Sequence, residues 1–206
     1  MIMLLFFDVI STIPEFYLIE EKKVILNRKI LTKQGDKLSD NIFEVYSKLN
    51  SELNLTQNLK KIVITNGPGS YTSLRVGSAF VAGLSISKNL TVCEISAQDI
   101  IMFKSKNRDI NKVCVFIASA NDQQFLCTMN NLFKIENNTV NEKKVFIPKK
   151  IDTIYYNEHK LNTEYQNVKQ YKFSFIDELI LNLDHLNFNN NKILKPIYVS
   201  NNKLLN

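Results

Sequence analysis

The stretch from Lys61 to Gly77, which reads KIVITNGPGSYTSLRVG, constrains this chain more than any other feature. The β-branched run KIVIT predicts a strand. A tight turn is expected at 67–69, because glycine permits backbone conformations closed to other residues and proline stiffens the chain. A helix opening at Ser70 is predicted to follow, with Ser70 and Thr72 placed to cap it.

The start of such a helix favours an anion, because its backbone N–H groups are exposed and its dipole is positive there. The turn residues Gly67, Pro68, Gly69, Ser70 and Thr72 are therefore candidate anion contacts. The alternative is a turn that only brings a helix close to a sheet. The residues favour this alternative: no Lys follows the second glycine as in GxxxxGK[ST], and position 72 is Thr where GxGxxG needs a glycine.

The elements around this turn predict a mixed α/β fold. Strands are expected at 2–8, Phe16–Glu21, Lys23–Leu31, Lys61–Thr65 and Thr91–Ile95, and helices at Leu38–Leu53, 70–87 and Ala97–Phe103. We expect Asp36 or Ser39 to cap the first helix. The order βββαβαβα indicates a partly parallel sheet with right-handed crossovers.

The polar stretch Lys104–Lys112 predicts a boundary between a domain of residues 1–103 and a second of residues 104–206. In the second, strands are expected at Val113–Ala118, Gln124–Met129, Leu132–Ile135 and Ile197–Val199, with a helix at Phe175–Leu186. Residues 137–172 are rich in Asn, Lys and Tyr and are predicted to be mostly irregular.

The helix after the turn holds two interior glycines, Gly77 and Gly83, each costing about 1 kcal/mol relative to alanine. Close approach of another element would offset that cost, and this element lies either within the monomer or in a partner. The apolar stripe that begins at Leu38 offers a second helix for such an interface. The predicted interface residues are Leu38, Ile42, Val45, Leu49, Ser73, Val76, Gly77, Phe80, Gly83 and Leu84.

Charge is a weak guide to partners here. The chain has 206 residues and a net charge of +6, but its 26 basic residues are 23 Lys and 3 Arg, and it holds 26 Asn, as expected from an AT-rich genome. Residues 101–206 carry 15 basic and 10 acidic groups. Nucleic-acid sites favour Arg, so this diffuse Lys excess only weakly indicates RNA.

The remaining residues indicate no catalytic, metal-binding or cofactor-binding site. Asp8 ends the first strand, where it faces a metal–phosphate ligand or caps the next turn. His159 and His185 have no ligand cluster around them, and no GxSxG is present, so we expect no catalytic residue, metal or cofactor. The cysteines Cys93, Cys114 and Cys127 form no CxxC pair, and the N-terminus lacks a signal segment or spanning helix, as in a cytoplasmic protein.

GPGSYTSLRVG followed by SAFVAGLS resembles the signature GPGSFTGLRxG of the TsaB (YeaZ) family, with Tyr71 for a Phe and Ser73 for a Gly. MLLFFD resembles the opening strand of that family, VCVFIASANDQQFLCTM its strand–turn–strand, and KPIYVSNN its terminal PxYLR. The resemblance is strongest over about residues 1–118.

The resemblance implies an actin/Hsp70/kinase-like (ribonuclease-H-like) fold of two small lobes, the C-terminal one degraded. It also implies a pseudoenzyme that pairs with TsaD, or with itself, through its first two helices. With TsaE, such a pair helps transfer a threonylcarbamoyl group to adenosine 37 of ANN-decoding tRNAs, and the pseudoenzyme meets tRNA only through the complex.

Two alternatives remain open. One is a small phosphotransferase or peptidase of the same fold, and the other is a stand-alone RNA-binding module that uses the basic C-terminal half. No glycine follows Gly83, which argues against the second glycine-rich loop that a nucleotide clamp of this fold needs.

Overall fold

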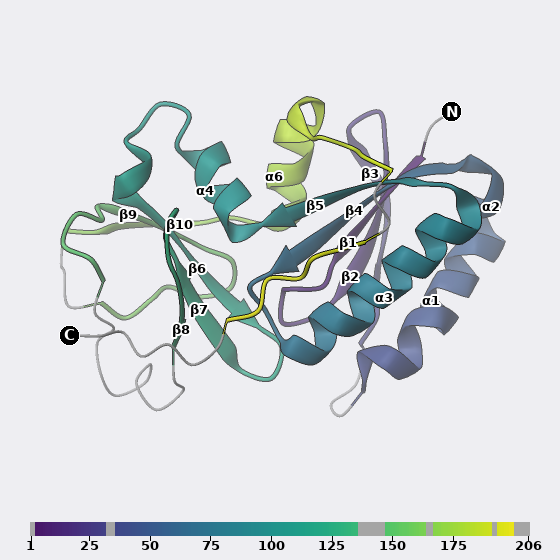
Figure 1. Cartoon of the computed structure of the whole chain (residues 1–206), viewed down its shortest axis with the longest axis horizontal. Coiled ribbons are helices and arrows are strands. Elements are labelled where there is room, and N and C mark those ends of the chain that lie inside the picture. The colour runs from purple at the N-terminus through teal and green to yellow at the C-terminus, as the bar shows by residue number, and fades with distance from the viewer. Residues whose placement is uncertain (1–2, 32–35, 136–146, 164–166, 191–192, 200–206) are drawn as a thin grey trace.

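The computed structural model describes residues 3–31, 36–135, 147–163, 167–190 and 193–199, and it contains two five-stranded sheets (Figure 1). The first sheet has the order β3-β2-β1-β4-β5, built from β1 (Met3–Asp8), β2 (Glu15–Glu20), β3 (Lys23–Lys29), β4 (Leu59–Gly67) and β5 (Thr91–Ser96). Three helices precede or follow β4: α1 (Leu38–Leu53), the short α2 (Leu55–Asn58) and α3 (Tyr71–Lys88). The predicted order βββαβαβα is confirmed, with α2 added.

The second sheet has the order β10-β9-β6-β7-β8. Its strands are β6 (Val113–Ser119), β7 (Gln123–Cys127), β8 (Leu132–Ile135), β9 (Thr153–Tyr156) and β10 (Lys169–Lys172). The other elements are α4 (Ala97–Lys104), α6 (Phe175–Asn182) and two 3₁₀ turns, η1 (Ile110–Lys112) and η2 (Leu183–His185).

The two sheets repeat one topology. In the first, β1, β2 and β3 are antiparallel neighbours and β4 and β5 are parallel additions; in the second, β6, β7 and β8 are antiparallel and β9 and β10 are the parallel additions. The second copy is reduced: β9 and β10 have four residues each, and no helix joins them in the part of that connection that the structure describes. This duplication is the two-lobed architecture that the sequence predicts.

Several local predictions are wrong. Residues 137–172 are predicted to be mostly irregular. Of these, 137–146 and 164–166 lie outside the described residues, and the rest contain β9 and β10, which the sequence does not predict. Residues 197–199 form no strand, although the Ile197 N–H donates to the Asn66 carbonyl at 2.7 Å. Neither Asp36 nor Ser39 caps α1, whose N-cap residue is Lys37, and Ser70 precedes α3 without a side-chain capping bond.

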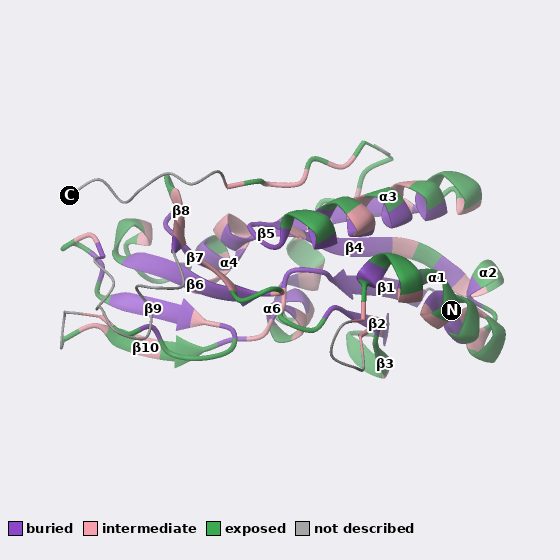
Figure 2. Cartoon of the chain, turned by 90° about the horizontal axis from the view of Figure 1, so that it is seen from below, coloured by how far each residue is buried: buried purple, intermediate pink, exposed green. Residues whose placement is uncertain are grey.

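Helices α1 and α3 cover one face of the first sheet (Figure 1). Figure 2 shows that α3 turns buried residues toward the sheet and exposed residues away from it. No helix within the described ranges is long and apolar enough to cross a membrane.

The three cysteines are buried free thiols, and burial raises the pKa of each, that of Cys93 to about 12. Since the thiolate is the reactive form, we expect Ellman's reagent at pH 8 to label none of them in the native chain within minutes. Denaturation should release all three. Rapid native labelling would show that the core around β5, β6 and β7 opens readily.

Candidate functional site on helices α1 and α3 and in the cleft between the sheets

Phe80 of α3 is the centre of an aromatic cluster that joins both helices to the sheet. Its ring centroid lies 5.7 Å from that of Phe16 and 6.3 Å from that of Phe7, on the strands below. On α1, the rings of Tyr46 and Phe43 each lie 5.4 Å from it in edge-to-face geometry. Each such pair contributes about 0.5–1.5 kcal/mol beyond its buried area, so Phe80 fixes how α1 and α3 sit on the strands.

The two glycines of α3 have different surroundings. A Cβ atom on Gly77 would lie 2.9 Å from Val9 Cγ2 and 3.2 Å from Phe7 Cε1, so Gly77 allows α3 to approach β1 within the monomer. A Cβ atom on Gly83 would have no heavy atom within 4 Å. Only Gly83 is therefore open to a partner.

The predicted interface residues divide in the same way. The structure buries seven of them beneath the two helices, so the expectation that these contact a partner is corrected: Leu38, Ile42, Leu49, Ser73, Gly77, Phe80 and Leu84. Val45 and Val76 are half-buried and Gly83 is exposed.

The outward residues of the two helices include two large apolar side chains that the sequence analysis missed. Phe43 is 68% exposed and Ile86 is 65% exposed. Ala79 and Gly83 on α3 are also exposed. We call these four residues the outer face of α1 and α3. The signal that would have found Phe43 and Ile86 is their position outside the buried stripe of each helix.

The glycine turn before α3 is closed. Gly67 has φ +130°, and a Cβ atom there would lie 2.6 Å from the Ile197 carbonyl oxygen. The Ser70 N–H donates to Ser119 Oγ of β6 at 3.0 Å, and the same oxygen lies close to Gly69. The backbone at 67–70 is buried, so the candidate anion contacts there are wrong, and of the five turn residues only Thr72 is exposed.

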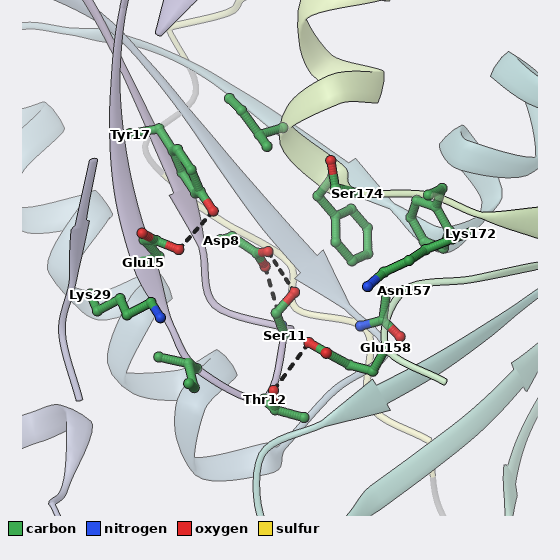
Figure 3. A pocket seen from close by; sticks show the side chains of 14 residues that line it. Asp8, Ser11, Thr12, Glu15, Tyr17, Lys29, Asn157, Glu158, Lys172 and Ser174 are labelled. Atoms are coloured by element: carbon green, nitrogen blue, oxygen red, sulfur yellow. Dashed lines mark hydrogen bonds between the residues drawn. The ribbon is translucent and has the colours of Figure 1, made fainter. Parts of the chain in front are cut away.

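A cleft of about 310 Å³ lies between the two sheets. The β1–β2 connection lines one side with Asp8, Ser11 and Thr12, and the chain after β9 and β10 lines the other (Figure 3). The Thr12 hydroxyl crosses the cleft to donate to Glu158 Oε1 at 3.1 Å. The lysines Lys29 and Lys172 also line it.

The carboxylates of the cleft are engaged by neighbouring groups. Asp8 accepts hydrogen bonds from the Ile10 and Ser11 N–H groups and from the Ser11 and Thr65 hydroxyls, at 2.6–3.2 Å. Glu15 accepts from the Tyr17 hydroxyl at 2.7 Å and from Asn27 Nδ2 at 2.5 Å. The cleft lining contains no Cys or His, and the described ranges hold no cluster of three metal-ligating side chains.

Comparison with known proteins agrees with this architecture. The family model described as "TsaD: tRNA N6-adenosine threonylcarbamoyltransferase" matches residues 24–193. YeaZ from Pseudomonas aeruginosa superposes with a TM-score of 0.59 at 14% identity, over 97% of this chain and 100% of that chain. A second Pseudomonas aeruginosa structure, of an uncharacterized protein with similarity to peptidase YeaZ, gives 0.60 at 13% identity over the same shares.

No protein with a curated description matches the sequence significantly. At 13% and 14% sequence identity the two structures are evidence for the fold alone, and they confirm the predicted actin/Hsp70-like class. The family model spans well over half of the chain, and the GPGSYTSLRVG stretch lies within its match. The chain therefore belongs to the family that the TsaD model describes, and its fold is that of the YeaZ structures.

Proposed function

We propose that this chain is a non-catalytic subunit that pairs with a TsaD-type catalytic subunit. The match to the family model described as a tRNA N6-adenosine threonylcarbamoyltransferase supports a role in this tRNA modification. In the proposed complex the catalytic partner transfers the threonylcarbamoyl group from threonylcarbamoyl-AMP to adenosine 37 of ANN-decoding tRNAs. TsaE joins the pair, the complex works in the cytoplasm, and the same face makes a homodimer when the partner is absent.

The outer face of α1 and α3 is the observation that carries this proposal. Phe43 is 68% exposed, and its ring packs against that of Phe80 in edge-to-face geometry, so it contacts the core without being covered. Ala79 and Gly83 are exposed on α3, and because their side chains are small or absent another helix can come close to the backbone there. An aromatic anchor beside small residues suits a helix of a partner, because the distance at which two helices pack depends on the side chains at the contact, and small ones allow a closer approach.

The cleft supports a non-catalytic role. In a working site of this fold the carboxylate that ends the first strand would face a metal–phosphate ligand, whereas Asp8 is buried and accepts four hydrogen bonds from its own neighbours. Asp8 is thus the cap of the β1–β2 connection, which is the second of the two roles that the sequence allowed.

Gly83→Arg should abolish pairing with the TsaD encoded by the same genome. The substitution places a long charged side chain on the outer face, and it leaves the fold intact because no heavy atom lies within 4 Å of the new Cβ. Gly83→Ala should raise the free energy of unfolding by about 1 kcal/mol through helix propensity alone. Size-exclusion chromatography of the mixed subunits and urea unfolding measure the two effects.

Gly77→Leu is the matched control, because it changes the other glycine of the same helix. Its side chain would meet Val9 and Phe7, so it should lower the free energy of unfolding by about 1–3 kcal/mol or more. Normal pairing by a folded Gly83→Arg chain would show that the outer face is not the interface.

Phe43→Asp should weaken pairing by at least about thirtyfold, as expected for a central aromatic anchor worth about 2 kcal/mol or more. Leu181→Asp on α6 is its control, since Leu181 is 73% exposed and lies on a helix away from α1 and α3 (Figure 1). Titration calorimetry with the partner should separate the two variants. Equal losses in both would indicate that exposed apolar surface in general drives the association.

The pKa of Asp8 is raised, chiefly because burial disfavours its charged form, although hydrogen bonds from Ser11, Ile10 and Thr65 oppose this. Between its pKa in the unfolded chain and its higher pKa in the folded chain, Asp8 binds more proton in the folded state, so its contribution to stability falls as pH rises above the ordinary value of 3.8. Asp8→Asn removes that loss. The unfolding free energy of Asp8→Asn minus that of the wild type should increase as pH rises above about 4.

Urea unfolding across that pH range measures the difference. Glu44→Gln is a control of opposite sign, because the hydrogen bond and charge of Lys48 lower the pKa of Glu44. A difference for Asp8→Asn that stays flat or falls with pH would contradict the structural role. Turnover of ATP or threonylcarbamoyl-AMP by the pure chain, lost in Asp8→Ala, would instead favour a small enzyme of the same fold.

A further inference from the structure

We propose that a cationic patch at the amino ends of β6, β9 and β10 binds the phosphodiester backbone of RNA. The patch consists of Lys106, Arg108, Lys112, Lys149, Lys150 and Lys169, and all six side chains belong to exposed residues. They come from three separate segments: the connection from α4 to β6, the residues before β9, and the first residue of β10. In the proposed function this RNA is the tRNA substrate.

Backbone contacts hold these segments together. The Asp152 N–H donates to the Lys112 carbonyl at 3.0 Å, and the Lys169 N–H donates to the Asp152 carbonyl at 2.9 Å. Arg108 Nη1 donates to the Thr153 hydroxyl at the start of β9, at 3.1 Å. The six cations are therefore placed by the ordered end of the sheet.

The charge of the patch is unbalanced. Of the described residues in these three segments, two are carboxylates, Asp109 and Asp152. Hydrogen bonds from Asn111, with the charges of Lys112 and Lys150, lower the pKa of Asp109, which places both lysines near it. Asp152 accepts from the Thr153 hydroxyl at 2.7 Å.

None of the six cations forms an ion pair with any residue of the described ranges. Elsewhere in that part of the chain, Lys22, Arg28, Lys48 and Lys104 each meet a carboxylate. Like charges held together repel one another, so a polyanion is the partner that this end of the molecule fits.

Tyr171 favours RNA over an anionic membrane. It lies two residues after Lys169 on the edge strand β10, on the same side of that strand, and it is 42% exposed with its ring 5.7 Å from that of Tyr155. A base can stack on such a ring. Insertion into a membrane would need exposed apolar side chains, and the described residues of 106–112 and 147–152 include no exposed large apolar side chain. Attraction by charge alone is common to RNA and an anionic membrane, and the vesicle measurement below separates them.

The patch lies at the opposite end of the molecule from α1 and α3 (Figure 1). A partner subunit on the outer face of those helices therefore leaves the patch exposed, so one chain can bind the partner and RNA at the same time. The inference rests on the proposed function only for the identity of the RNA, because the geometry itself specifies a polyanion.

The test is binding of a fluorescent, unmodified ANN-decoding tRNA transcript to the full chain, followed by anisotropy between about 50 and 300 mM salt. The triple variant Lys112→Gln, Lys149→Gln, Lys150→Gln should bind at least about tenfold more weakly at low salt, with a salt slope shallower by about one for each phosphate contact removed. The control triple Lys23→Gln, Lys37→Gln, Lys60→Gln removes the same charge from exposed lysines of the first lobe and should bind within about twofold of wild type. Tyr171→Ala should weaken binding several-fold and Tyr171→Phe should not.

Equal losses in the two triple variants would overturn the proposal, because they would show that net charge alone attracts RNA. Wild-type binding by the patch variant would also overturn it, as would binding to phosphatidylserine vesicles without binding to RNA. Pairing with TsaD is scored in parallel by size exclusion. Normal pairing by Gly83→Arg would refute the proposed interface and leave the RNA result standing, whereas normal RNA binding by a patch variant that still pairs would refute the patch alone.

Discussion

The distance between α3 and β1 is the constraint on which the first lobe depends, and Gly77 sets it. Val9 and Phe7 lie where a side chain at position 77 would have to go. Because the helix lies this close, Phe80, one turn further on, reaches the rings of Phe7 and Phe16. Tyr46 and Phe43 of α1 then pack against Phe80 from outside the sheet. The exposed position of Phe43 follows from core packing, since its ring rests on a buried neighbour that cannot move.

The sequence predicts this lobe well and its surface poorly. The strand, turn and helix around GPGS are at β4 and α3 as expected, because glycine, proline and β-branched residues act locally. Gly77 and Gly83 were placed in one interface because both are glycines in one helix. Six residues at 3.6 per turn put them about 240° apart, so one faces β1 and the other faces solvent. The angular positions of Gly77 and Gly83 around the helix distinguish the two residues, whereas their shared residue type does not.

The anion site at the turn failed for a different reason. The local sequence does end a strand and open a helix there, but the atoms that close the turn come from Ser119 and Ile197. Those residues are distant in the sequence, and neither has a pattern that points to the turn. Strands β9 and β10 were missed in the same way. Each has four residues, and their pairing depends on β6, which lies many residues before them.

An AT-rich genome would account for the number of lysines in the chain, but it would not account for their positions in the fold. A bias acting on the whole sequence would scatter them, and in the described part of the first lobe two lysines, Lys22 and Lys48, form ion pairs with carboxylates. At the amino ends of β6, β9 and β10 the fold instead brings cations of three segments together around two carboxylates that are already hydrogen-bonded. Holding those charges together carries a repulsive cost that grows as salt is lowered. The grouping of these six cations depends on backbone contacts between segments that are far apart in the sequence, so it is a property of the fold that composition could not reveal.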